Sequence, residues 1–220
     1  MNKPQQITNF NSSLIGSNPS QLTDVNGVIY FTADDGREGR ELWKLDERGN
    51  PVPVGDINNG FASSNPDNLI AVNGTLYFTA DDGRGGRELW KINERGFPEQ
   101  IDDINNGKSS SNPSNLTVFN NTLYFIADNE RYGRELFKLD NLGNRRVAAE
   151  IKYNSSKSSN PANLTIVNDT LYFTLSDNDG RIQLWRETKT EETDYIEGIP
   201  LLITDFTSLL QIMKELNFGL

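Results

Sequence analysis

The sequence predicts an all-β fold assembled from four copies of one structural unit. Asn18, Asn65, Asn112 and Asn160 mark the same position in four similar stretches, at spacings of 47, 47 and 48 residues. Each stretch is rich in β-branched and aromatic residues and lacks the 3.6-residue periodicity of an amphipathic helix. Such a unit must stack on its own copies to bury its apolar face. We therefore expect a small β-propeller of four four-stranded blades, followed by a short C-terminal helix.

The second copy shows the expected strands most clearly. Asn73-Gly74 is the dipeptide preferred in two-residue hairpin turns, where both residues need a positive φ angle. A polar, glycine-rich turn follows at residues 81–86. The four strands of this blade are expected at residues 69–72, 75–80, 88–92 and 99–104.

The consecutive bulky residues Leu76, Tyr77 and Phe78 place large side chains on both faces of one strand. A sheet that is wetted on one side would alternate apolar and polar residues instead. A propeller blade packs against a sheet on each face, so we expect these aromatic residues and their equivalents in the other copies to form the core between blades. Trp43, Trp90 and Trp185 lie one strand further out, where they either join the core or line clefts between blades.

The repeat divides the chain into six parts. Blades are expected at residues 18–64, 65–111, 112–159 and 160–206. Residues 1–17 are expected to supply a detached outer strand and loop that close the ring, and residues 207–220 to form an amphipathic helix.

The two ends of the chain each offer a strand to the last blade. Residues 6–10 align with the fourth strands of the repeats, and we predict that they pair beside residues 183–186 in the same or a neighbouring chain. Residues 201–206 are a second candidate, so one outer strand is surplus. A monomer or an intertwined homodimer of eight blades is therefore expected. The apolar residues Leu209, Leu210 and Met213 are candidates for docking a partner.

The composition excludes several classes of function. The chain has 220 residues and a formal net charge of −10, whereas nucleic acids and anionic lipids need clustered Lys and Arg. We therefore expect neither nucleic-acid binding nor membrane insertion. The absence of Cys and His removes thiolate chemistry and the commonest general base and metal ligand. The first residues show no apolar signal-peptide core, which predicts a cytoplasmic location unless the chain was excised from a longer exported protein.

Short motifs recur at fixed places in the copies. Gly-Arg-Glu-Leu-Trp occupies residues 39–43 and 86–90 after an Asp-Gly turn, and Asp-Ile-Asn occupies residues 56–58 and 103–105. Together with the Ser-Asn-Pro segments, these motifs resemble the bacterial ELWxxDGT repeats over residues 5–186. The resemblance implies a propeller, in a protein that contains many copies of the repeat and is often located at the cell surface. It implies no catalytic motif. The Asp-Gly-Thr that closes the family motif is replaced here by Asp46-Glu47-Arg48. The repeat length and architecture are also similar to those of tachylectin-like sugar-binding propellers.

The polar loops between the second and third strands, and those from the fourth strand to the next blade, open on one face and form the candidate binding surface. Carboxylates and amides pair well with hydroxyl groups, so we expect a non-enzymatic module that binds a carbohydrate or another polyol. A protein-interaction scaffold using the propeller face and the C-terminal helix is one alternative, and a glycoside hydrolase working through paired carboxylates is another. The candidate ligand residues are Asp34, Asp35, Asp81, Asp82, Asp128, Asn129, Trp43, Trp90, Trp185, Asn59 and Asn106.

The same residue types leave other interpretations open. Asp, Asn, Ser and Gly are also ordinary turn formers. No cofactor is expected, although a calcium ion would accept such oxygen ligands, and Asp177 and Asp179 come nearest to a calcium-binding loop. Arg-Glu pairs recur in the first three copies, and we expect them to form ion pairs between blades with Asp56, Asp103 and Glu150.

Overall fold

The computed structural model describes residues 16–105, 107, 109–139, 143, 145–148, 158–176, 179–188 and 193–195, together with Ile7. In this part of the chain, sixteen strands form four antiparallel sheets of four strands each, and there is no helix. Each sheet is a meander of consecutive strands. The all-β class and the four repeated, propeller-like sheets predicted from the sequence are confirmed.

The strand bounds follow the repeat. The first sheet contains β1 (Ser20–Val25), β2 (Val28–Asp34), β3 (Arg40–Leu45) and β4 (Pro51–Gly55). The second contains β5 (Asp67–Val72), β6 (Thr75–Asp81), β7 (Arg87–Ile92) and β8 (Pro98–Gln100). The third contains β9 (Ser114–Phe119), β10 (Thr122–Asn129), β11 (Gly133–Leu139) and β12 (Arg145–Val147). The fourth contains β13 (Ala162–Val167), β14 (Thr170–Ser176), β15 (Ile182–Thr188) and β16 (Thr193–Tyr195).

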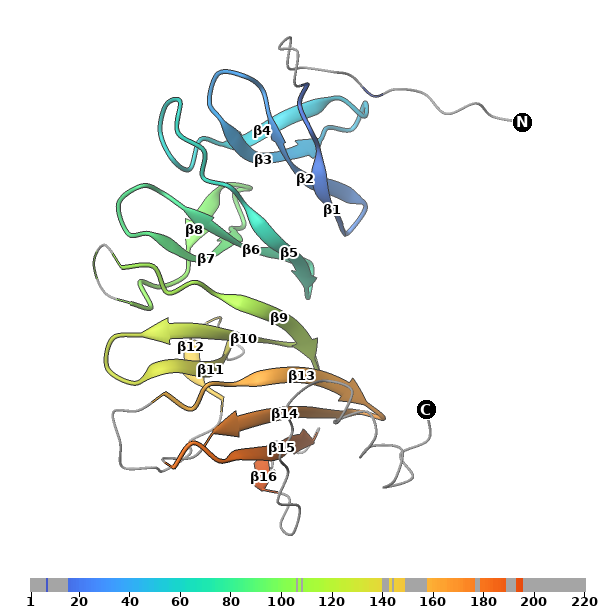
Figure 1. The fold of residues 1–220 in the computed structure, drawn as a ribbon. Helices are drawn as coiled ribbons and strands as arrows, with labels where there is room; N and C mark the ends of the chain where they lie inside the picture. Colours follow the sequence, from blue (N-terminus) through green and yellow to red (C-terminus); the bar gives the residue numbers. More distant parts are fainter. Residues whose placement is uncertain are drawn as a thin grey trace.

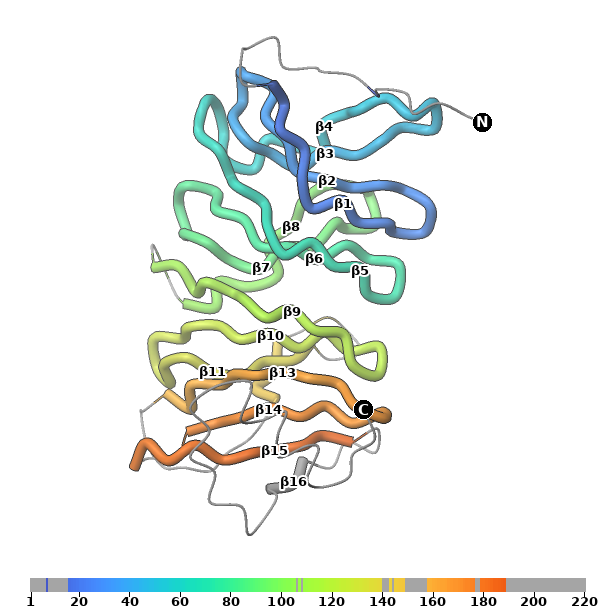
Figure 2. The backbone as a smooth tube through the Cα atoms, turned by 45° about the vertical axis from the view of Figure 1, so that its right-hand side comes forward, coloured from blue at the N-terminus to red at the C-terminus, as the bar shows by residue number. Residues whose placement is uncertain are grey.

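The four sheets, called blades from here on, stand in one row. Figure 1 shows them in chain order from the blue first blade to the orange fourth blade, and the turned view in Figure 2 shows the same order. The first strands of successive blades lie side by side, β1 next to β5, β5 next to β9 and β9 next to β13. Both views place the first and fourth blades at opposite ends. The described residues therefore form an open row of blades, and closure into a ring within one chain is not seen among them.

The core lies between the blades, as the runs of bulky residues predicted. Tyr30 and Leu42 of the first blade pack with Phe78 of the second. Leu89 of the second blade packs with Phe125 of the third. The same arrangement recurs between the third and fourth blades. Because each sheet buries both of its faces, the second strands carry apolar residues at consecutive positions.

The outer strand of the fourth blade differs from the prediction. It is β16, in which Tyr195 pairs with Trp185 and Thr193 with Glu187 of β15. The sequence had placed residues 6–10 at this edge, and that prediction is wrong for the chain's own fourth blade because β16 already occupies the position. Residues 201–206 and the predicted helix at 207–220, with Leu209, Leu210 and Met213, lie outside the described residues.

Candidate functional site: a cleft across three blades

The paired aspartates predicted as ligand residues accept hydrogen bonds from backbone amides within their own turns. Asp34 Oδ1 accepts a hydrogen bond from the Gly36 amide at 2.6 Å, and Asp35 Oδ1 accepts one from the Arg37 amide at 2.8 Å. In the second blade Asp81 and Asp82 make the equivalent bonds to the amides of Gly83, Arg84 and Gly85, at 2.7 to 2.9 Å. These carboxylates act as turn formers, which was the alternative interpretation of the sequence.

The remaining polar candidates do not converge on one site. Asp128 forms an ion pair with Arg134 at 3.1 Å, and Asn129 accepts a hydrogen bond from the Arg131 amide at 3.0 Å. Asn59 is exposed. Asp179 pairs with Arg181 at 3.1 Å. Asn106 and Asp177 lie outside the described residues, among which no group of three or more acidic side chains could hold a metal ion.

The tryptophans belong to the packing between strands. The Trp43 indole donates a hydrogen bond to the Ala33 carbonyl at 3.2 Å, and the Trp90 indole donates one to the Ala80 carbonyl at 3.1 Å. Trp185 packs against the apolar core between the third and fourth blades. Their ring faces are therefore engaged in the fold rather than assembled into a stacking platform.

The recurrent glutamates form what we call inter-blade joints. In each joint a glutamate on the third strand of one blade binds the serine that precedes the first strand of the next. Glu41 accepts hydrogen bonds from the Ser64 amide at 2.6 Å and from the Ser64 hydroxyl at 2.5 Å. The same two bonds join Glu88 to Ser111 and Glu135 to Ser159. The predicted ion pairs with Asp56 and Asp103 are wrong, because Arg40 and Arg87 donate instead to carbonyl and hydroxyl groups of their own blades. Glu150 lies outside the described residues.

Burial controls the protonation of these glutamates. Glu41 is 2% exposed, and the loss of hydration raises the pKa of its carboxyl to about 7, against the opposing effect of its hydrogen bonds to Ser64. The nearby charge of Asp56 adds to the increase in pKa. The pKa values of Glu88 and Glu135 are raised by burial in the same way.

We expect stability to fall as the pH rises toward neutrality. A carboxyl whose pKa is higher in the folded state binds its proton more tightly there, so it stabilises the fold below its unfolded pKa. For Glu41 this contribution is lost between the ordinary glutamate value of 4.5 and about 7. Glu41→Gln should therefore show a smaller drop in unfolding free energy between pH 5 and pH 8 than the unaltered protein, measured by urea denaturation. The exposed Glu47→Gln is the control, and an equal pH dependence in all three proteins would contradict the prediction.

A cleft of about 1110 Å³ lies at the opposite end of the blades from the acidic turns. Thr75, the first residue of β6, lines the cleft, whereas Asp81 at the other end of this strand belongs to the acidic turn. The lining comes from three successive blades, with Tyr30 from the first, most of the wall from the second, and Leu123 from the third. None of the described ligand candidates from the sequence lines this cleft.

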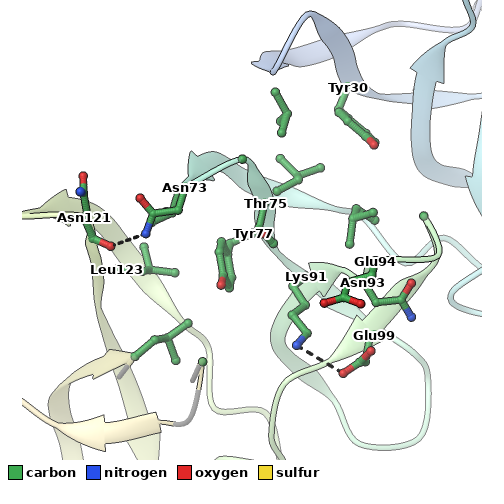
Figure 3. Close-up of a pocket in the computed structure, with 18 of the residues that line it drawn as sticks. Tyr30, Asn73, Thr75, Tyr77, Lys91, Asn93, Glu94, Glu99, Asn121 and Leu123 are labelled. Atoms are coloured by element: carbon green, nitrogen blue, oxygen red, sulfur yellow. Dashed lines mark hydrogen bonds and ion pairs between the residues drawn. The ribbon is translucent and has the colours of Figure 1, made fainter. Parts of the chain in front are cut away.

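Hairpin turns build the rim of the cleft. Asn73 and Gly74 have φ angles of 49° and 77°, which confirms the predicted turn with two positive φ angles. In the third blade Asn120 and Asn121 form the equivalent turn, with φ angles of 48° and 60°. The Asn73 side-chain amide donates a hydrogen bond to the Asn121 carbonyl at 2.8 Å, so the two turns are linked across the rim (Figure 3).

The cleft presents charges of both signs beside aromatic hydroxyl groups. Figure 3 shows Lys91 pointing toward Glu99, with which it forms an ion pair at 3.5 Å. Glu94 and Arg95 from the turn after β7 also line the cleft. Tyr77 borders it, and burial raises the pKa of this phenol, which keeps it neutral and able to donate a hydrogen bond.

Comparison with known proteins finds similar solved structures but no family. No protein-family model and no curated protein matches the chain. Among solved structures, TolB from Acinetobacter baumannii is similar, with 12% identity and a TM-score of 0.44 over 76% of this chain and 40% of TolB. A puromycin hydrolase has 15% identity and a TM-score of 0.48, over 84% of this chain and 30% of its own. Prolyl oligopeptidase B from Galerina marginata has 14% identity and a TM-score of 0.45, over 79% and 26%. The chain thus spans two fifths or less of each of these proteins.

These findings correct the function predicted from the sequence. The described aspartates chosen as sugar ligands are engaged in turns or an ion pair, and the tryptophans are engaged in packing. Carbohydrate recognition at the repeated loops, with its scaffold and glycosidase alternatives, is therefore not retained. In the part of the chain that the structure describes, no helix has the length and apolarity needed to cross a bilayer.

Proposed function

We propose that the cleft across the first three blades binds a short peptide without catalysing a reaction on it. The observation that carries the proposal is the combination of both charge signs with amide and phenol groups in one concave surface. A peptide offers amide N–H and C=O groups at every residue, together with an ammonium group and a carboxylate. A cleft of about 1110 Å³ is slightly larger than the usual small-molecule site and accommodates an extended chain.

Each lining group has a partner on such a ligand. The Tyr77 phenol suits peptide amides, because it can pair with a carbonyl group or an N–H group. Asn93 Oδ1 accepts from the Arg95 and Phe97 amides, so the Asn93 side chain offers its N–H groups to a peptide carbonyl. Lys91 and Arg95 suit carboxylates, and Glu94 and Glu99 suit ammonium or guanidinium groups. The side chains of Lys91 and Glu99 are 30% and 49% exposed, respectively. Because exposed ion pairs contribute little to stability, either side chain can leave the pair and bind a ligand with little loss of free energy.

The proposal is tested by affinity selection from a mixture of random hexapeptides, followed by calorimetric titration of the selected peptides. We expect selected peptides to carry charges of both signs. Lys91→Ala and Tyr77→Phe should each weaken binding. For Lys91→Ala the loss should be about 10- to 150-fold, because a charge-assisted hydrogen bond is worth about 1.5–3 kcal/mol.

Lys44→Ala is the matched control. Lys44 of β3 pairs with Tyr30 of β2 as Lys91 of β7 pairs with Tyr77 of β6, and Lys44 does not line the cleft. Its replacement should leave binding unchanged. Failure to enrich any hexapeptide over a Lys91→Ala/Glu99→Gln double variant would contradict the proposal.

A further inference from the structure

The contact between the third and fourth blades contains a carboxylate that is held by a tyrosine and a lysine. The Tyr124 hydroxyl and the Lys138 ammonium group each donate a hydrogen bond of 2.8 Å to the same oxygen, Oε1 of Glu187. Tyr124 on β10 and Lys138 on β11 are partners within the third blade, whereas Glu187 lies on β15 of the fourth. Glu187 is only 1% exposed. A tyrosine and a lysine paired in this register therefore bind a carboxylate that comes from the side of the next blade.

The second blade repeats this tyrosine–lysine pair. Tyr77 of β6 pairs with Lys91 of β7 in the register in which Tyr124 pairs with Lys138. Both Tyr77 and Lys91 line the cleft, and Figure 3 shows the two side chains next to each other in its wall. In the part of the chain that the structure describes, the Tyr77 hydroxyl makes no hydrogen bond. The second blade thus presents to the cleft the two donors that hold Glu187 further along the row.

The third blade has an apolar residue where the fourth has this glutamate. Glu187 follows Arg186, which is the counterpart of Lys138 in its blade, and the residue after Lys138 is Leu139. Leu139 and Tyr77 pack in the same cluster between the second and third blades, and both line the cleft. Between these two blades the chain therefore supplies the two donors and the cleft, and the third blade supplies no carboxylate at this register.

No other described group completes the pair in the second blade. Glu99 lies 3.5 Å from Lys91 with its side chain 49% exposed, and it makes no hydrogen bond to Tyr77. In the first blade Lys44 pairs with Tyr30 in the same register, but Lys44 does not line the cleft. Among the described blades, the Tyr77–Lys91 pair is therefore the one that meets a ligand in the cleft with both of its donors.

We propose that the Tyr77 hydroxyl and the Lys91 ammonium group together bind a carboxylate of the ligand in the cleft. This inference rests on the peptide binding proposed above and names the group of the peptide that the site selects. The carboxylate accepts a hydrogen bond from each donor, as Glu187 does from Tyr124 and Lys138, and it takes the place of Glu99 beside Lys91. The C-terminus of a peptide and an aspartate or glutamate side chain both supply this chemistry.

Three pools of random hexapeptides test the proposal and distinguish the sources of the carboxylate. The first pool has a free C-terminus and lacks Asp and Glu, the second is amidated and contains them, and the third is amidated and lacks them. We expect the first or the second pool to be enriched on the protein at least about tenfold over the third, because hydrogen bonds to a charged group are the stronger ones. Lys91→Ala and Tyr77→Phe should each reduce this preference, and Lys44→Ala should preserve it.

The pools separate this inference from the peptide binding on which it rests. Equal enrichment of all three pools would overturn the carboxylate site and leave peptide binding intact. A preference for one of the first two pools that survives both Lys91→Ala and Tyr77→Phe would also overturn it. Enrichment of no pool would overturn peptide binding itself.

A carboxylate grafted onto the third blade tests the same two donors without any peptide. Leu139→Glu places a glutamate at the register of Glu187, in the cluster in which Tyr77 packs. Adding Lys91→Ala should then lower the urea midpoint more than it does in the matched Leu139→Gln background, which has a side chain of the same length and no charge. Equal shifts in the two backgrounds would overturn the site, and the hexapeptide pools decide the question if Leu139→Glu does not fold.

Discussion

Replacing Phe125 by alanine should lower the free energy of unfolding by about 3–5 kcal/mol. Phe125 lies on β10 with no exposed surface, and its ring stacks on Phe137 with centroids 5.6 Å apart and planes at 24°. It packs in the cluster that joins the second and third blades, where Leu89 is also fully buried. Removing the ring leaves a cavity between the second and third blades. The neighbouring side chains are held in place by both sheets and cannot fill it.

Urea denaturation measures this effect, and Phe61→Ala provides the control. Phe61 is 91% exposed, so its replacement should change the unfolding free energy by no more than about 0.5 kcal/mol. The slope of free energy against urea should stay the same in both variants, because the surface exposed on unfolding hardly changes. Equal losses in the two variants would contradict the assignment of the core to the inter-blade space.

Replacing Glu88 by alanine should cost about 3 kcal/mol of stability, since it opens a joint. The Glu88 carboxylate accepts hydrogen bonds from the Ile104 amide at 3.2 Å, the Ser111 amide at 2.7 Å and the Ser111 hydroxyl at 2.5 Å. Ile104 is 2% exposed and Ser111 is fully buried, so water does not replace the lost acceptor. Each buried donor left without a partner costs about 1–3 kcal/mol.

Glu88→Gln separates hydrogen bonding from charge in the same joint. Glutamine retains an oxygen acceptor and removes the buried charge, and Gln183 already occupies this register position in the fourth blade. Since one of the two oxygens that accept from Ser111 and Ile104 becomes an NH2 group, we expect its unfolding free energy in urea at pH 7 to lie between those of the unaltered protein and Glu88→Ala. A loss as large as that of Glu88→Ala would mean that the charge, and not the hydrogen bonds, stabilises the joint.

The outer edge of the fourth blade shows where local sequence becomes insufficient. The inner strands were predictable because runs such as residues 75–80 combine β-branched and aromatic residues beside a turn that demands positive φ angles. The three residues of β16 sit in a charged stretch with no such pattern. They become a strand because β15 offers an open edge with which Tyr195 and Thr193 pair. Which segment pairs with this edge is therefore decided by the assembled sheet and not by the residue pattern of the segment itself.

The cleft could not be predicted from local sequence for a related reason. Aspartate pairs at 34–35 and 81–82 have the composition of a ligand site and of a turn, and only the positions of the amide groups distinguish the two. The cleft is lined by residues of three blades, Tyr30, Lys91 and Leu123 among them, so its surface exists only after the blades have stacked. The Asn-Gly and Asn-Asn turns were visible in the sequence, but nothing local indicated that they meet across a concave surface.

By itself the sequence determined the kind and number of units, because a repeat of about 47 residues with bulky groups on both faces can be buried only by stacking blades. Tertiary structure decided the rest. It placed Glu41 beside the buried Ser64 of the next blade, because this contact depends on how closely the two blades pack. It also arranged the four blades in an open row, with the first blade at one end and the fourth at the other.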